Sequence, residues 1–212
     1  MRTAFIDTLF ELAQSDPRIV LVVGDLGFGV VHRFRDELPD QFVNAGVAEQ
    51  LMTGLAAGMA LSGRIAVTYS IANFPVIRCL EQIRNDVCHH SANVKIVAVG
   101  GGFAYGGLGP SHFATEDLTV MRALPSLTVV APNDPLEVQL ATRAIIAHDG
   151  PCYLRLGRAG EEVVHEGPFS FTLGRAIPVR PGRDVTLLVT GGLLRTALDA
   201  SDALAAVGLS AA

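Results

Sequence analysis

The chain has 212 residues, half of them hydrophobic, which is enough to bury one sizeable core and the beginning of a second. Its 16 basic and 21 acidic residues give a formal net charge of −5, and because no basic cluster opposes that balance we expect no nucleic-acid surface. No stretch is long and uncharged enough for a transmembrane helix, and the N-terminal segment lacks the apolar core of a signal peptide. We therefore expect no membrane association.

Apolar runs typical of buried strands alternate along the chain with amphipathic runs typical of helices. In chain order they predict a helix at 5–14, strands at 18–25 and 41–46, a helix opening near Val47, a strand at 64–70 and a helix at 74–90. They go on to predict a strand at 94–100, a helix opening at Thr115, a strand at 127–132, a helix at 134–149 and a strand at 152–157. Continuous apolar strands separated by helices indicate an α/β fold, a parallel sheet with helices on both faces.

The pattern changes after the last of these strands. We place a first domain at 1–157 and a linker at 158–183, where periodicity is irregular and charges, prolines and glycines are frequent. Residues 184–192 predict another strand and 193–208 another helix. One strand and one helix cannot bury each other, so 184–212 is interpreted as the start of an incomplete second α/β domain, truncated or completed by other protein.

The three cysteines, Cys79, Cys88 and Cys152, form no CxxC pair and no cluster at the spacing of a zinc site. Each lies in an apolar segment, which favours buried free thiols in a reducing cytoplasm. The glycine-rich segments 24–29 and 100–107 depart from GxGxxG, and neither GxxxxGK[ST] nor GxSxG occurs. Stand-alone dinucleotide binding and a hydrolase nucleophile are therefore not favoured.

Five segments point to one family. In order they are "GDL", "NAGVAEQ", "NFPVIRCLEQIRND", "GPSHFATEDLTVMRALP" and "VVAPND". Together they resemble the pyrimidine-binding domain of the transketolase family of thiamine diphosphate enzymes, especially the split form in which two polypeptides share what one long chain holds elsewhere. The resemblance covers roughly the first 160 residues, and the tail from Asp184 is similar only to the start of the family's C-terminal domain.

Glu49 is the lone acid in an otherwise small and apolar run, where an unpaired carboxylate is costly. The resemblance implies that Glu49 hydrogen-bonds N1′ of the aminopyrimidine of thiamine diphosphate, which favours the imino form that takes a proton from the thiazolium ring. A helix-capping or ion-paired glutamate is the structural alternative.

Three further residues match cofactor contacts of the family. Phe74 matches the aromatic residue that stacks on the pyrimidine, and Ile71 and Ile77 replace further aromatics with an apolar wall. Asp25 and Val47 match positions that line the cofactor across the subunit interface. Ordinary core packing for Phe74 and a turn or cap role for Asp25 are the alternatives.

His112, within "GPSH", matches a catalytic histidine that faces the thiazolium ring and the substrate. Arg2 and Arg158 match the two arginines that hold a sugar phosphate, for which a planar guanidinium is suited. The alternatives are a structural loop histidine for His112, a frayed terminus for Arg2 and a linker charge for Arg158. Family members usually have a histidine at Gly100 and acids at Gly107 and Leu108, and those side chains contact the hydroxyl groups of the sugar. The part of the site that binds the hydroxyls is therefore altered here, which points to a specialised sugar or acyl acceptor.

The family's GDG segment and later asparagine, which hold Mg²⁺ and the diphosphate, do not occur in this sequence, so we assign no metal ligand to this chain. The resemblance implies a partner, an N-terminal diphosphate-binding subunit that holds Mg²⁺, in an α2β2 heterotetramer. Ala56, Ala57, Gly58 and Ala60 would let the helix after Glu49 pack closely against another helix.

The sequence thus predicts a cytoplasmic, transketolase-like transferase subunit that is active only with its partner. The expected reaction moves a two-carbon ketol unit from a ketose phosphate to an aldehyde acceptor. Two alternatives stay open: a thiamine-dependent 2-oxo-acid decarboxylating synthase or dehydrogenase β-subunit, and a non-catalytic scaffold or regulatory homologue.

Overall fold

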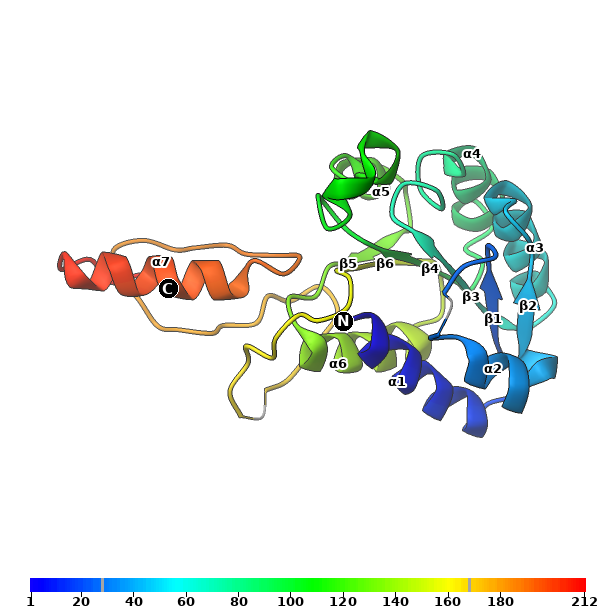
Figure 1. Cartoon of the computed structure of the whole chain (residues 1–212), viewed down its shortest axis with the longest axis horizontal. Helices are drawn as coiled ribbons and strands as arrows, with labels where there is room; N and C mark the ends of the chain where they lie inside the picture. The colour runs from blue at the N-terminus through cyan, green and yellow to red at the C-terminus, as the bar shows by residue number, and fades with distance from the viewer. Residues whose placement is uncertain (28, 168) are drawn as a thin grey trace.

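The computed structural model describes residues 1–27, 29–167 and 169–212. A six-stranded sheet has helices on both faces, and a tail leads from it to a last helix (Figure 1). Every strand pair is parallel, and the order is β2-β1-β3-β4-β6-β5. The strands are β1 Ile19–Val23, β2 Phe42–Asn44, β3 Ile65–Ile71, β4 Val94–Val99, β5 Thr128–Val130 and β6 Cys152–Leu156. The predicted α/β parallel sheet is confirmed.

The helices divide between the two faces of the sheet (Figure 1). One face carries α1 Arg2–Ser15, α2 His32–Glu37 and α6 Pro135–Ala147. The other carries α3 Glu49–Leu61, α4 Leu80–Gln82, the π-helical turn Ile83–Cys88 and α5 Asp117–Arg122. Because both faces are covered, the strands read as continuous apolar runs rather than alternating ones.

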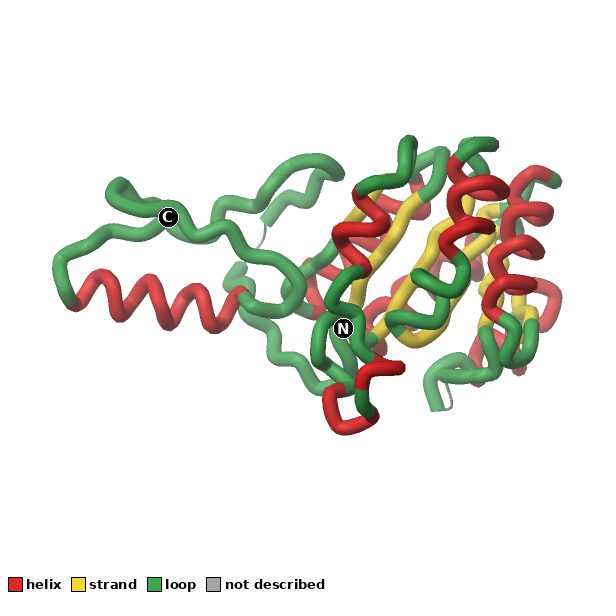
Figure 2. The backbone as a smooth tube through the Cα atoms, turned by 90° about the horizontal axis from the view of Figure 1, so that it is seen from above, coloured by secondary structure: helices red, strands yellow, loops and turns green. Residues whose placement is uncertain are grey.

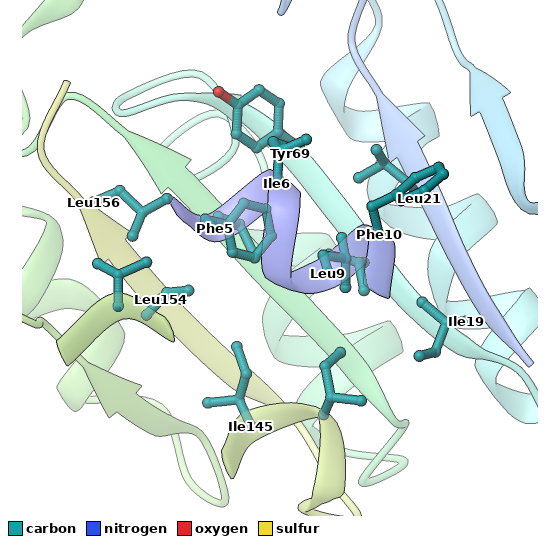
Figure 3. Packing of buried hydrophobic residues seen from close by; sticks show 14 of the residues in the cluster. Phe5, Ile6, Leu9, Phe10, Ile19, Leu21, Tyr69, Ile145, Leu154 and Leu156 are labelled. Atoms are coloured by element: carbon teal, nitrogen blue, oxygen red, sulfur yellow. The ribbon is translucent and has the colours of Figure 1, made fainter. Parts of the chain in front are cut away.

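Alternate side chains of each strand supply the two cores. In β1, Ile19 and Leu21 join the core under α1 and α6, whereas Val20 packs with Met52 of α3 on the opposite face. Figure 3 shows the first core, where the ring of Phe5 is stacked 6.0 Å from that of Tyr69. A large apolar side chain buried in this way stabilises the fold by about 1.5–3 kcal/mol.

The helix predicted at 74–90 is wrong in its first part. Residues 72–79 form successive turns, and helical structure begins only at Leu80. Phe74 N donates to the carbonyl of Ile71 at 2.8 Å and Cys79 N donates to that of Val76 at 3.2 Å, so these bonds close turns to the third residue back rather than a helix. The chain after β3 is therefore an irregular turn that sets Phe74 and its neighbours at the strand's end.

The tail differs from its predicted strand. Residues 184–192 form no strand among the described residues but a single bridge between Val185 and Ala211, followed by α7 Leu194–Ala206. Figure 2 shows α7 standing apart from the sheet. A cavity of about 560 Å³ lies between β5 and this tail. A lone segment has no neighbouring strand to pair with, so the β-type sequence stays extended without a ladder.

The three cysteines are free and buried, as the sequence predicts, and burial raises the pKa of each thiol, that of Cys88 to about 11. No helix of the described residues has the length and apolar character needed to cross a membrane.

Candidate functional site

The carboxyl ends of the six parallel strands lie at one edge of the sheet, and the predicted site residues follow those ends. In sheet order, Glu49 follows β2, Asp25 follows β1, Phe74 follows β3, the loop 100–114 with His112 follows β4, and Arg158 follows β6. Residues far apart in the sequence are thus arranged along the edge where open α/β sheets bind ligands.

Glu49 begins α3 and is only 2% exposed. Arg78 Nη1 donates to its Oε2 at 2.9 Å, and no described residue donates to Oε1. The backbone of β1 lies close by, since a Cβ built on Gly24 would stand 3.6 Å from both Cγ and Oε1 of Glu49. Thr53 Oγ1 donates to the main-chain oxygen of Glu49 at 2.9 Å. The acid is buried, paired by one oxygen, and fixed by the first turn of its helix.

Arg78, Phe74 and His112 continue outward from this acid. The Cζ atom of Arg78 lies 5.2 Å from the centroid of the Phe74 ring. The ring of His112 meets that of Phe74 edge to face, with centroids 5.2 Å apart and planes at 76°. Ser111 Oγ lies 3.0 Å from His112 Nδ1. Three separate segments therefore bring a carboxylate, a phenyl ring and an imidazole into one group.

Sequence reasoning named three members of that group and missed Arg78. The signal was available: Arg78 is a cation in the apolar run "FPVIRCL", and the lone buried acid of the preceding helix needs a partner. Sequence distance hid the pair, because 29 residues separate Arg78 from Glu49.

Asp25 and Asn44 brace the turn that leads to Glu49. Asn44 Nδ2 donates to Asp25 Oδ1 at 2.9 Å, and Asn44 Oδ1 accepts from the backbone N–H groups of Asp25 and Gly46, each at 3.0 Å. Asp25 has a left-handed φ of 54°. Val47, two residues before Glu49, is 74% exposed and points away from this chain's core. Asp25 thus contacts the supporting turn, and Val47 offers an apolar surface.

The two predicted phosphate arginines are neighbours in space. Arg2 N donates to Arg158 O at 3.4 Å, and Arg158 Nη1 reaches Ala104 O at 3.5 Å. Arg2 Nε and Tyr69 Oη are both buried without a hydrogen-bond partner among the described residues. Burial raises the pKa of Tyr69, so its hydroxyl stays a proton donor. Unsatisfied donors of this kind suit an anionic group.

The loop after β4 is held from beneath by a buried polar group. Asp117 Oδ2 accepts from Tyr153 Oη at 2.7 Å and from Arg155 Nε at 2.9 Å, and Arg155 Nη2 donates to Ala114 O at 3.0 Å. Burial raises the pKa of Tyr153, which therefore remains a donor to Asp117. Gly102 and Ala114 close the loop with a pair of backbone hydrogen bonds, 2.9 and 3.0 Å long. The segment carrying His112 is thereby fixed to α5 and β6.

Tyr105 fills the space in front of Gly100. A Cβ built on Gly100 would collide with the Tyr105 ring, and Gly100 has a φ of 98° that favours glycine. The phenol ring therefore occupies the place where a side chain at position 100 would stand. Gly107 and Leu108 are exposed on the same loop.

Comparison with known proteins shows the family of this chain. The family model described as transketolase, pyrimidine binding domain, matches residues 1–160. The chain is 38% identical over 212 residues to a subunit of the apulose-4-phosphate transketolase of Phocaeicola vulgatus, covering 99% of this chain and 68% of that protein. It is also 38% identical over 212 residues to the 6-deoxy-6-sulfo-D-fructose transketolase subunit SqwH of Clostridium sp. strain MSTE9, covering 100% of this chain and 66% of that protein.

Among solved structures, one described as split gene transketolase, inactive beta4 tetramer, matches with a TM-score of 0.88 at 36% identity. The match covers 99% of this chain and 68% of that one. This chain thus spans about two thirds of the length of the relatives it matches.

Proposed function

The chain belongs to the transketolase family, and from that premise we propose that it is the pyrimidine-binding subunit of a split, thiamine diphosphate-dependent transketolase. The observation that carries the proposal is the group formed by buried Glu49, the Phe74 ring and the His112 imidazole at the ligand edge of the sheet. Such a group offers a carboxyl, an aromatic face and a proton carrier within one site.

The residues present fit the aminopyrimidine end of the cofactor. Glu49 would hydrogen-bond N1′ and Phe74 would stack on the ring, while Asp25 fixes the turn before Glu49 and Val47 covers the ring from the interface. Thiamine diphosphate supplies, when bound, a carbon nucleophile that can cleave the bond beside a ketose carbonyl and pass on the two-carbon unit. Glu49 would hold a proton at N1′, and its burial would keep water away from that hydrogen bond.

The substrate end is assigned to three residues. His112, fixed by its loop, would donate a proton to or accept one from a substrate oxygen beside Phe74. Arg2 and Arg158 would hold a terminal anion, supported by the unpartnered Arg2 Nε and Tyr69 Oη. Two relatives are named for sugars that carry a phosphate and a sulfo group, and an anion site of this kind suits either. We propose a ketose phosphate as donor and an aldehyde as acceptor.

The diphosphate and Mg²⁺ are assigned to a partner subunit, an N-terminal transketolase section, in an α2β2 assembly. The outer stripe of α3 supports this, since Leu51 and Leu61 are 63% and 61% exposed and a Cβ on Gly54 or Gly58 would meet no atom within 4 Å. The small residues expected at this contact need correction. Ala56 and Ala57 are buried in this chain's own core, because they lie on the inner side of the helix. Glycines rather than alanines face outward.

The test is reconstitution with an N-terminal transketolase section that carries the diphosphate-binding domain. We expect thiamine diphosphate-dependent transfer from ketose phosphates to aldehydes only in the mixture, and a loss of about 100-fold or more in kcat for Glu49→Gln. The matched control is Glu37→Gln, which changes an exposed glutamate at the end of α2 and should leave turnover unchanged.

Three results would contradict the proposal in different ways. Unchanged turnover in Glu49→Gln would remove the catalytic role of this acid. Turnover of 2-oxo acids instead of ketose phosphates would favour the decarboxylating synthase or dehydrogenase β-subunit. A stable complex without any thiamine-dependent activity would favour the scaffold or regulatory homologue.

A further inference from the structure

Arg78 makes two contacts at the site, and both lie where the proposed function places the cofactor. Its Nη1 donates to Glu49 Oε2 at 2.9 Å, and its guanidinium lies over the ring of Phe74 with Cζ 5.2 Å from the centroid. The carboxylate and the phenyl face are the two groups assigned above to N1′ and to stacking on the pyrimidine. One planar, N–H-donating group thus takes both contacts at once.

We propose that Arg78 is a positioning residue that holds these two contacts in place of the aminopyrimidine and must leave them when the cofactor enters. The inference rests on the proposed function. A guanidinium resembles an aminopyrimidine in what matters here: both are flat, both donate N–H to a carboxylate, and both pack on an aromatic face. Arg78 therefore keeps the acid and the ring oriented before cofactor binding.

The burial of Glu49 makes such a partner necessary. A carboxylate with 2% of its side chain exposed is strongly disfavoured when it has no partner, and the described residues offer Arg78 as its one ion pair. The guanidinium also takes the Phe74 ring, so a planar ring that stacks on Phe74 beside Glu49 competes with Arg78 for the same place.

Arg78 is able to move out once the cofactor gives Glu49 another hydrogen-bond partner. Its side chain is 50% exposed, and its only hydrogen bond to a described residue is the one to Glu49. A long, half-exposed side chain that swings into solvent regains its hydration. The apparent affinity for the cofactor is the intrinsic affinity multiplied by the fraction of molecules in which Arg78 has left these contacts. It also selects ligands that can offer both an N–H and a flat face.

The experiment measures the Kd of thiamine diphosphate for the reconstituted complex by isothermal titration calorimetry. Arg78→Ala removes the competitor, so we expect the Kd to fall about fivefold, the scale of a partly exposed ion pair. The matched control is Arg84→Ala, because Arg84 is an exposed arginine of the following helical turn whose Nη1 donates to its neighbour Asn85 at 2.8 Å. The Kd of that variant should not change.

An unchanged or higher Kd in Arg78→Ala would overturn the inference, because the protein must bind the cofactor less tightly when a competing residue is present than when it is removed. Should the alanine variant fold poorly, Arg78→Gln keeps a hydrogen-bond donor near Glu49 but removes the charge, and a lower Kd is again expected. Glu49→Gln and Phe74→Ala separate this inference from the proposed function. If neither weakens cofactor binding, the proposed function fails; if both do and Arg78→Ala does not tighten it, the role of Arg78 alone fails.

Discussion

Gly100, just after β4, shows how one missing side chain shapes the loop that carries His112. Its φ of 98° is strained for other residues, and the Tyr105 ring fills the space that a Cβ would need. The aromatic side chain and the glycine are therefore interdependent. The Tyr105 ring occupies the space that a side chain at position 100 would fill.

We predict that Gly100→Ala destabilises the chain and displaces the loop. Left-handed strain and the collision with Tyr105 together should lower the free energy of unfolding by about 2–4 kcal/mol. Urea unfolding measures the change, and proteolysis within 101–113 should become faster. Gly107→Ala is the control on the same loop, because no atom lies within 4 Å of its added Cβ. Equal stability of the two variants would show that Tyr105 does not depend on Gly100.

At the scale of elements, α6 is connected to the segment after β6 through one carboxylate. Asp134 Oδ1 caps α6 by accepting from Glu137 N at 2.8 Å, and its Oδ2 accepts from the backbone N–H groups of Val164 and His165 at 2.9 and 2.8 Å. Burial alone would raise the pKa of Asp134, but these three N–H donors together hold it below the ordinary value of 3.8. One side chain thus holds the start of α6 and the segment at Val164 and His165 together.

We predict that Asp134→Ala lowers the free energy of unfolding by about 2–4 kcal/mol near neutral pH, because it removes the cap and leaves buried N–H groups unpaired. The carboxylate's contribution is fully present above pH 3.8 and is lost as the pH falls through the lower pKa of the folded state. The difference between wild type and variant should therefore narrow by about pH 3. Urea unfolding at both pH values measures it.

Asp40→Ala is the control for that experiment, since Asp40 is an exposed carboxylate in the turn before β2 that accepts no hydrogen bond from the described residues. Its effect should be small at both pH values. A difference for Asp134→Ala that stays constant from neutral pH to about pH 3 would contradict the role given to its charge.

The elements that the sequence predicts well are those whose burial is decided locally. "IVLVV" is apolar on both faces, and "VKIVAV" is so apart from the buried Lys95, whose Nζ donates to the carbonyls of His148 and Gly150; both become central strands because helices cover both faces. The helix prediction fails at 74–79 because the apolar spacing there fits a helix, whereas the chain forms successive turns whose N–H groups mostly bond three residues back. The strand prediction fails at "VTLLV" because strand formation needs a neighbour, which local sequence does not specify.

The sequence also predicts part of the candidate site: it locates single residues but not the contacts between them. Motif order locates Glu49, Phe74 and His112, and the structure places them side by side, although their roles stay predictions. What sequence does not supply are the pairings across the sheet edge. Arg78 with Glu49 and Tyr105 with Gly100 depend on how loops from different strands meet. Such contacts follow from strand order, which periodicity does not contain.

At the scale of the whole molecule, the site lies on an edge that this chain leaves open. α3 begins with the buried acid, and an outer stripe faces away from the sheet, formed by Val47 just before the helix and by Leu51, Gly54, Gly58 and Leu61 on it. An exposed apolar stripe next to a ligand edge is typical of a contact surface. Under the proposed function, the surface that would bind the partner and the residue that would bind the cofactor belong to the same helix, which would couple assembly to cofactor binding.

We predict that Leu51→Asp prevents assembly with the diphosphate-binding partner while the chain itself stays folded. Leu51 is 63% exposed, so the change should have little effect on the stability of the isolated chain. Burying the new charge without a partner in an interface would cost on the order of several kcal/mol. Size-exclusion chromatography with light scattering measures assembly, and circular dichroism checks the fold. Val207→Asp, at the end of α7 and 73% exposed, is the matched control and should assemble normally. If Leu51→Asp assembled as wild type does, the outer stripe of α3 would not be the partner surface, and the aminopyrimidine contacts at its start would have to be completed from another side.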